Sequence, residues 1–342
     1  MRIALFNIMM PYIRGGAEIL VDDLAEQLQA HGHEVLIFRL PFPLSFEAPL
    51  VATIESARTL CFDEFDRVIA FKFPAYCIKH HAKVIWMFHQ FRQVYDLWGK
   101  EYGLQPSPTT ESIRKIVMAA DDEDIPRSFH VYTIAKQVAN RLKHFNNINS
   151  TVLYPPLQHH ELYYTQKTGD YLFYPSRINS MKRQHLAIEA MCHVKSGVRL
   201  VIAGVCEGSY FAQLKKLIQD NDLEKRVELR NEWISDEEKR ALMANALGVV
   251  FIPYREDYGF VSLEAFYSAK PIITCTDSGG ATEFVENGKS GFEVRPRPED
   301  IAAAMDKLYF DKSMAESMGK AGQDEIHRRE ITWPSTIKRL LA

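Results

Sequence analysis

The sequence predicts an α/β protein built from two doubly wound domains in series. Two runs of alternating strand and helix patterns predict this, and a polar stretch with two prolines separates them at 154–170. The chain, at 342 residues, is also long for a single hydrophobic core. We therefore expect one domain over 1–155 and a second over 156–329. A closing helix at about 330–342 is expected to return to the first domain.

Composition narrows the class of protein. Hydrophobic residues make up 46% and charged residues 25%, which is ordinary for a soluble globular protein. The 41 basic and 44 acidic side chains give a net charge of −3, so no nucleic-acid partner is indicated. The longest apolar runs are strand-sized, well below the roughly 20 residues of a membrane span. Five scattered cysteines favour a reducing, cytoplasmic setting without a disulfide framework.

Apolar, β-branched runs define the strands expected in the first half, and the first one leads through a glycine pair into an amphipathic helix at 17–32. Gly15 and Gly16 either let backbone approach a ligand closely or form a simple tight turn. They do not complete a GxGxxG pattern, which argues against a nicotinamide dinucleotide. The expected strands are 2–8, 33–40, 67–71, 83–88, 129–134 and 151–156.

The same alternation restarts in the second half. Helices are expected at 182–194 and 235–246, and Ser235 with Glu238 three residues later forms a capping box for the latter. Parallel strands place their carboxyl ends at one edge of a sheet, and we expect a ligand in a cleft where such edges meet. The expected strands are 170–177, 198–205, 226–230, 247–254 and 270–275.

The stretch REDYGFVSLEAF (255–266) follows a strand with a short loop and then a helix. The loop carries Glu256 and Gly259, and the free amides at the start of the helix suit a phosphate. Glu264 lies roughly 6–8 Å further along the helix and can reach the hydroxyls of a ribose. Glu256 is expected at a sugar on the other side of the phosphate. The amides expected at the phosphate are those of Phe260, Val261 and Ser262.

Two further stretches contribute to the expected site. Arg177 and Lys182 bracket a strand-to-helix loop, where they suit a diphosphate or are two solvated cations. The glycine-rich loop and short helix over 277–294 either line the same cleft or form a capped turn. Three other groups of His, Asp and Glu residues either bind a metal or lie in solvated loops. Solvated loops are favoured, because no set of ligands at a metal spacing accompanies these groups. These groups are His80-His81, His159-His160 and Asp122-Glu123-Asp124.

Taken together, these motifs resemble the retaining sugar-nucleotide glycosyltransferases of family 4. That family has the GT-B fold, with two Rossmann-like domains facing a central cleft. The resemblance rests on SRINSMKRQHLAIEAM, on the two glutamates around DYGFVSL, and on GGATEFVENGKSGFEV. It is strong over roughly 170–310 and looser over 1–155. Many relatives have glycine where this chain has Arg183, a third cation that either helps to bind phosphate or is solvated.

The resemblance implies a role for each matching residue. Arg177 and Lys182 would neutralise the donor's diphosphate, Glu264 would hold the ribose, and Glu256 would contact the sugar hydroxyls near the reaction centre. The resemblance implies an enzyme that acts without a metal, so no metal and no cofactor are expected. The remaining positions are Trp233 and Ile234 at the base, Gly15 and Gly16 facing donor and acceptor, and His89 facing the sugar.

The implied activity is transfer of a hexosyl group from a nucleotide sugar, with UDP the likeliest nucleotide on family frequency, to a saccharide or lipid-linked saccharide. The α linkage would be retained, in polysaccharide or glycoconjugate synthesis. The alternatives are a nucleotide-sugar hydrolase or epimerase on the same fold, and a non-catalytic nucleotide-binding protein. An aromatic stripe at 86–103, with helical spacing, is more often core. It would otherwise form an acceptor surface or a peripheral contact with the inner face of the membrane.

Overall fold

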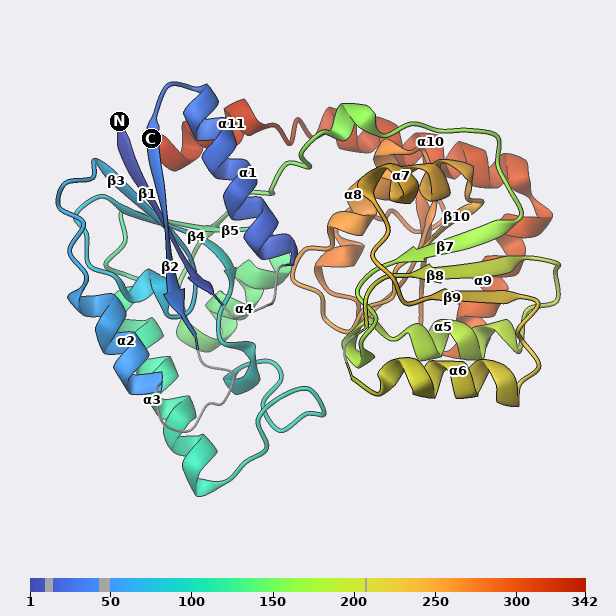
Figure 1. The fold of residues 1–342 in the computed structure, drawn as a ribbon, viewed down its shortest axis with the longest axis horizontal. Coiled ribbons are helices and arrows are strands. Elements are labelled where there is room, and N and C mark those ends of the chain that lie inside the picture. The colour runs from blue at the N-terminus through green and yellow to red at the C-terminus, as the bar shows by residue number, and fades with distance from the viewer. Residues whose placement is uncertain (10–14, 43–49, 207) are drawn as a thin grey trace. The chain divides into compact units, whose positions relative to one another are not determined.

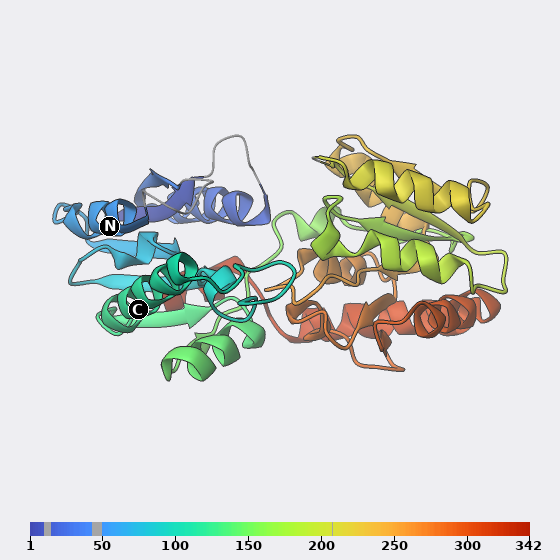
Figure 2. The same cartoon turned by 90° about the horizontal axis from the view of Figure 1, so that it is seen from below.

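The computed structural model describes residues 1–9, 15–42, 50–206 and 208–342 and falls into two compact units (Figure 1). One unit comprises Met1–Pro156 together with Ile331–Ala342, and the other comprises Leu157–Glu330. Among the described residues, each unit contains one sheet of six parallel strands with helices packed around it (Figure 2). The expected alternation of strands and helices is therefore present in both halves of the chain.

The first unit orders its strands β2-β1-β3-β4-β5-β6. Helix α1 packs against α11, and α3 packs against both α2 and α4. The sequence patterns had not singled out α3. The strands are β1 (Arg2–Met9), β2 (Glu34–Pro41), β3 (Arg67–Lys72), β4 (Lys83–His89), β5 (His130–Thr133) and β6 (Thr151–Val152), and the helices are α1 (Gly16–Ala30), α2 (Leu50–Thr59), α3 (Pro108–Asp124), α4 (Lys136–Asn146) and α11 (Trp333–Leu341).

The last helix, α11, is fastened to the first sheet by hydrogen bonds to its carbonyl groups. The buried guanidinium of Arg67 in β3 donates to the carbonyls of Leu341 and Ala342, each at 3.1 Å. The hydroxyl of Tyr132 in β5 donates to the carbonyl of Arg339 at 3.1 Å. The end of a helix has unpaired carbonyls that need such donors. The C-terminal segment is therefore part of the first unit.

The aromatic stripe at 86–103 belongs to the core of the first unit. Phe88, Phe91 and Tyr95 are 2%, 7% and 2% exposed, which confirms the interpretation as core for these residues. A membrane-facing or acceptor-facing role for them is wrong. The expected helical spacing is also wrong, because the segment contains only the short 3₁₀ turn η2 (Arg92–Val94) after β4. Trp98 is partly exposed and stacks under the guanidinium of Arg114.

The second unit orders its strands β12-β11-β10-β7-β8-β9. Helices α5 and α6 lie side by side (Figure 1). The strands are β7 (Tyr171–Pro175), β8 (Arg199–Ala203), β9 (Val227–Arg230), β10 (Gly248–Val250), β11 (Ile272–Cys275) and β12 (Gly291–Val294), and the helices are α5 (Gln184–Met191), α6 (Tyr210–Asp220), α7 (Asp236–Asn245), α8 (Phe260–Tyr267), α9 (Pro298–Phe310) and α10 (Lys312–Arg328).

Two predicted elements of the second unit differ in the structure. The helix expected over 182–194 is divided into the 3₁₀ turn η4 (Ser180–Lys182) and α5, with Arg183 between them. The glycine-rich stretch 277–294 contains the 3₁₀ turn η5 (Gly280–Thr282) and ends in β12, which was not predicted. Among the described helices of the chain, none is both long and apolar enough to cross a membrane.

Candidate functional site

The carboxyl ends of β7, β10 and β11 lie next to one another in the second sheet and bring two predicted residues together. Lys182 follows β7 and Glu256 follows β10. The ammonium group of Lys182 forms an ion pair with Oε2 of Glu256 and also lies 5.3 Å from the centre of the Phe251 ring. Their side chains are 16% and 27% exposed. A charged pair therefore stands at this edge, within reach of solvent.

Lys182 is held in place by the backbone of η4. Asn179 caps this turn, because its Oδ1 accepts from the amide of Lys182 at 3.1 Å. The buried hydroxyl of Tyr174, in β7, donates to the carbonyl of Lys182 and accepts from the amide of Ile252 at 3.3 Å. The lysine backbone is thus tied to the two neighbouring strands whose loops form the site.

The loop that carries Glu256 runs beside the glycine-rich loop 277–280. The amides of Arg255 and Glu256 donate to carbonyls of that loop at 2.9 and 3.0 Å, and the amide of Gly280 donates back to Glu256 at 2.7 Å. Gly279 has a φ of +65°, and a Cβ there would lie 2.4 Å from the carbonyl oxygen of Glu256. The glycines therefore allow close packing of backbone against backbone, which fixes the position of Glu256.

The start of α8 offers amides to an anion. Gly259 precedes the helix with a φ of +83°, and a Cβ there would lie 2.9 Å from the ring of Phe251. The amide of Ser262 is already used, since it donates to the carbonyl of Gly259 at 3.0 Å. The amides of Phe260 and Val261 donate to no described residue. These two amides, with the positive end of the helix dipole, are what the structure leaves for a phosphate.

Glu264 lies inside α8 and is only 7% exposed. Its Oε1 accepts from the ammonium of Lys239, in α7, at 2.8 Å. The hydroxyl of Tyr163 also donates to this carboxylate, and burial together with the nearby charge of Glu264 raises the pKa of that hydroxyl. Neither Lys239 nor Tyr163 was predicted. For the lysine, nothing in its EEKR context distinguishes it from a surface residue. The ribose-binding candidate is thus a paired carboxylate.

The other predicted donor residues are open to solvent. Arg177 is exposed, and its guanidinium makes no hydrogen bond or ion pair with the described side chains. Trp233 is 79% exposed, and Ile234 beside it is partly exposed, in the loop after β9. An exposed tryptophan side chain presents a large apolar face on which a planar ring can stack.

Arg183 differs from both sequence-based alternatives. It is 7% exposed, so it is not solvated. Its two terminal nitrogens donate to the two carboxylate oxygens of Asp277, each at 2.8 Å, so the guanidinium is already bound by protein. The guanidinium is therefore engaged within the protein, where it supports the backbone of the site.

In the first unit, the carboxyl edge of the sheet gathers the predicted glycines and histidine. The amide of Gly15 donates to Oε2 of Glu18 at 2.9 Å, and Gly16 is the first residue of α1. Oε1 of Glu18 accepts from the buried ammonium of Lys72 at 2.7 Å. Lys72 is in register with His89 between β3 and β4. Glu18 and Lys72 were not predicted.

In this group of residues, the positive charge of Lys72 and the amide of Gly15 stabilise the negative charge of Glu18. Burial raises the pKa of the Glu18 carboxyl, but Lys72 and the Gly15 amide lower it more, so the net pKa is below its ordinary value. The glutamate is therefore ionised and caps the start of α1. The Nδ1–H of His89 donates to the carbonyl of Gln90 at 2.8 Å, which holds the imidazole ring in its orientation.

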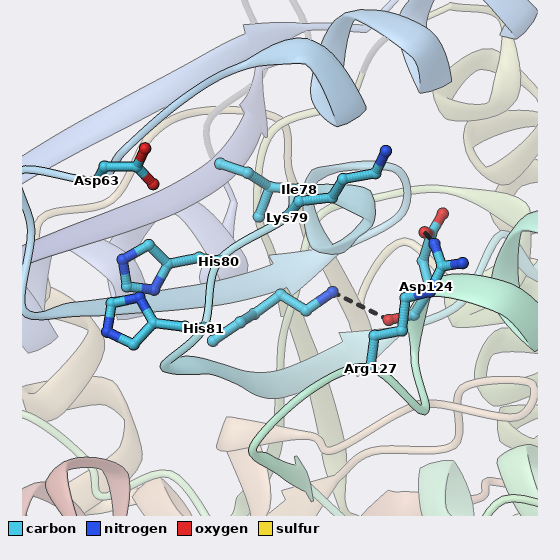
Figure 3. Close-up of a pocket in the computed structure, with 8 residues that line it drawn as sticks. Asp63, Ile78, Lys79, His80, His81, Asp124 and Arg127 are labelled. Atoms are coloured by element: carbon cyan, nitrogen blue, oxygen red, sulfur yellow. Dashed lines mark hydrogen bonds and ion pairs between the residues drawn. The ribbon is translucent and has the colours of Figure 1, made fainter.

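A cavity of about 390 Å³ lies at the opposite, amino edge of the first sheet (Figure 3). His80 and His81 stack at one end of it, with ring centres 4.4 Å apart, and Arg127 lies beside Asp124 at the other end. The imidazole of His80 accepts from the amide of Ala82 and donates to the carbonyl of Phe65, each at 3.1 Å. The lining residues are Asp63, Ile78, Lys79, His80, His81, Lys83, Asp124 and Arg127.

The charges around this cavity are largely matched within the protein. Burial lowers the pKa of Lys83 to about 8, and its ammonium donates to the carbonyl of Asp124 at 2.9 Å. The Asp124 side chain is 1% exposed and pairs with Arg58 at 2.8 Å. It lies in the last turn of α3, so the expectation of a solvated loop at 122–124 is wrong. In the part of the chain that the structure describes, no group of three or more His, Cys, Asp or Glu residues could hold a metal.

Comparison with solved structures defines the class of fold. Sucrose-phosphate synthase from Thermosynechococcus elongatus superposes with a TM-score of 0.78 at 16% identity, covering 99% of this chain and 97% of that one. Anabaena Alr3699/HepE, solved in complex with UDP, superposes with a TM-score of 0.71 at 17% identity, covering 100% and 98%. These identities are low, so the likeness concerns the fold alone, which is the two-domain α/β fold of the GT-B class.

The family follows from the sequence of the second unit. The model of the family "Glycosyl transferases group 1" matches residues 161–325. Mouse (Mus musculus) alpha-1,3/1,6-mannosyltransferase ALG2 is 28% identical over 229 residues, which are 60% of this chain and 54% of the mouse protein. A GDP-mannose-dependent alpha-(1-6)-phosphatidylinositol monomannoside mannosyltransferase of Mycobacterium tuberculosis is 34% identical over 165 residues, 44% of this chain and 41% of that protein. The second unit of the chain belongs to the group 1 glycosyltransferases, and the chain spans about half the length of these relatives.

Proposed function

We propose that the protein is a retaining glycosyltransferase that uses a nucleotide sugar as donor. The observation that carries the proposal is the arrangement at the carboxyl edge of the second sheet. There Lys182 and Glu256 pair beside the start of α8, and the exposed Arg177 follows β7, the same strand that Lys182 follows. Glu264 lies one helical turn inside the same helix. This arrangement provides positive charge for a diphosphate, with one carboxylate for a sugar and another for a ribose.

In the proposed reaction, the bond between the sugar's anomeric carbon and the diphosphate breaks, and negative charge builds up on the outer phosphate. Arg177, Lys182 and the amides at the start of α8 are preorganised to stabilise that charge. These groups make a metal unnecessary in the proposal, and no cofactor is required. The acceptor hydroxyl attacks from the face that the diphosphate leaves, so the α linkage is kept. Glu256 binds the sugar hydroxyls and acts electrostatically.

The acceptor in the proposal is a saccharide or a lipid-linked saccharide, and the process is polysaccharide or glycoconjugate synthesis. In the first unit, the Gly15–Gly16 turn and His89 are the groups that we assign to donor and acceptor. The expected nucleotide is UDP. GDP is the alternative, because the sequence relatives are named mannosyltransferases and one of them is named GDP-mannose-dependent.

Thermal unfolding with UDP, GDP, ADP or NAD, each with EDTA present, tests the donor. Ligand at 100 times its dissociation constant adds about 2.7 kcal/mol to the folded state. For a unit of this size, that raises the unfolding midpoint by roughly 5–10 °C. Arg177→Ala should remove most of the shift. Arg199→Ala is the matched control, because Arg199 lies at the amino end of β8, at the other edge of the same sheet, and pairs with Asp170. The proposal is refuted if only NAD raises the unfolding midpoint, or if none of the four nucleotides raises it.

The ribose assignment has its own test. Affinity is measured for the nucleoside diphosphate that binds and for its 2′-deoxy form, in wild type and in Glu264→Gln. A hydrogen bond to a charged carboxylate contributes about 1.5–3 kcal/mol, so wild type should prefer the ribose form by roughly tenfold or more. The glutamine keeps the side-chain volume but lacks the charge, and the preference should shrink. An unchanged preference in Glu264→Gln would show that another group reads the ribose.

A further inference from the structure

The Arg183 side chain joins three separate segments of the second unit. Besides the bidentate pair with Asp277, its Nε donates to the carbonyl of Ile252 at 2.7 Å, and a terminal nitrogen donates to the carbonyl of Pro253 at 2.9 Å. Both carbonyls follow β10, and Asp277 follows β11. Bidentate pairing and two further bonds hold the guanidinium in one orientation. The arginine is thus a fixed junction between η4 and two strand-end loops.

The backbone at Arg183 is in the left-handed region, with a φ of +55°. Glycine adopts that conformation without steric cost, whereas a residue with a Cβ does not. Glycine would be the least strained residue at this position, yet the chain has an arginine. Almost all of the hydrogen-bond donors of its guanidinium are bound within the protein. This combination points to the side chain as the reason for the residue.

The three joined segments carry both members of the Lys182–Glu256 pair. Lys182 directly precedes Arg183 in the chain. The loop after β10 continues to Glu256, whose amide donates to the carbonyl of Ser278, next to Asp277. The amide of Tyr254 also donates to the carbonyl of Met181 at 2.7 Å, which closes the connection between η4 and that loop.

We propose that Arg183 is a positioning residue that sets the placement of Lys182 relative to Glu256. It acts through these two side chains and contacts no substrate itself. The inference rests on the proposed function, in which Lys182 stabilises the departing phosphate while Glu256 holds the sugar. Small errors in the separation of two such groups reduce the rate of transfer far more than the binding of the nucleotide.

Arg183→Met tests this, because methionine fills part of the space without any donor. Turnover is measured as nucleoside diphosphate released from the nucleotide sugar that wild type consumes, and affinity for the nucleoside diphosphate is measured separately. We expect kcat to fall by roughly 10- to 100-fold and the affinity to change by less than about threefold. Arg199→Met is the control, since it removes an arginine–aspartate pair at the other edge of the same sheet and should leave kcat unchanged.

A double variant separates positioning from an independent effect. If Arg183 acts through Lys182, then Lys182→Met/Arg183→Met should be about as slow as Lys182→Met alone. Rate losses that simply multiply would overturn the inference. Arg183→Lys provides a second route if the methionine variant does not fold, because lysine keeps the charge but cannot form the bidentate pair. Folded Arg183→Lys with reduced kcat supports the inference, and wild-type kcat overturns it.

The two proposals fail in different ways. Wild type that binds no nucleoside diphosphate refutes the proposed function. Wild type that binds and turns over, with Arg183 variants that match it, refutes only the positioning role. If neither Arg183 variant folds, the arginine stabilises the fold rather than the placement of the pair, and the inference is also overturned.

Discussion

Replacing Lys239 by methionine is expected to destabilise the second unit by about 2–3 kcal/mol. The Nζ of Lys239 lies 2.8 Å from Oε1 of Glu264, and the two side chains are 23% and 9% exposed. A hydrogen bond between charged groups contributes about 1.5–3 kcal/mol. Leaving one charge of a fully buried pair alone costs about 3–5 kcal/mol, and the partial exposure of Lys239 reduces that figure.

Thermal unfolding of wild type and Lys239→Met measures this loss. For a unit of this size, the midpoint should fall by roughly 4–12 °C. Lys216→Met is the control, because Lys216 and Asp220 pair at 2.6 Å on the surface, with side chains 73% and 55% exposed. An exposed pair of this kind contributes about 0.5 kcal/mol or less.

The pH dependence has a defined sign. Burial lowers the pKa of Lys239, but Glu264 and Asp236 raise it more, so the net pKa is above 10.5. A raised lysine pKa contributes stability that is complete below 10.5 and is lost as the pH rises through the folded value. The difference between wild type and Lys239→Met should therefore persist to about pH 10 and shrink above it.

Two outcomes would refute this reasoning. One is a Lys239→Met protein whose free energy of unfolding lies within about 0.5 kcal/mol of wild type. The other is a double variant, Lys239→Met/Glu264→Gln, that loses as much as the two single variants together. We expect the double variant to be more stable than Lys239→Met, because the glutamine leaves no unpaired charge in the buried site.

The remaining predictions concern the buried Asp121 and the glycine-rich loop. Burial raises the pKa of Asp121 from 3.8 to about 7, although hydrogen bonds from Tyr95, Tyr76 and Gln90 lower it. The stability that a carboxyl of raised pKa contributes is complete below pH 3.8 and is lost as the pH rises toward 7. Over that range, the free energy of unfolding of wild type in urea should therefore fall by up to about 4 kcal/mol more than that of Asp121→Asn. Parallel pH curves for the two proteins would contradict this. Gly279→Ala should cost roughly 2–4 kcal/mol, since its Cβ would meet the Glu256 carbonyl. Gly288→Ala, at a φ of +80° with open space around it, should cost only about 1 kcal/mol, and equal losses would exclude the clash.

Local sequence patterns were sufficient for most of the strands and for the backbone of the site. The apolar, β-branched composition of a run such as LGVVFIPY predicts a buried parallel strand. The strand β10 begins at Gly248 within this run. The order strand, acidic loop, glycine and helix in 247–266 likewise predicted where α8 begins. These features depend on neighbours in the chain, so a short window of sequence contains them.

What only the tertiary structure decided were the partners of charged side chains. Lys239 and Arg183 look like ordinary surface cations in sequence, yet their partners, Glu264 and Asp277, lie 25 and 94 residues away. The aromatic spacing after β4 suggested a helix, but the chain there forms turns around buried rings. Burial and pairing depend on which strand ends become neighbours in the sheet, and long-range packing sets that order rather than any local pattern.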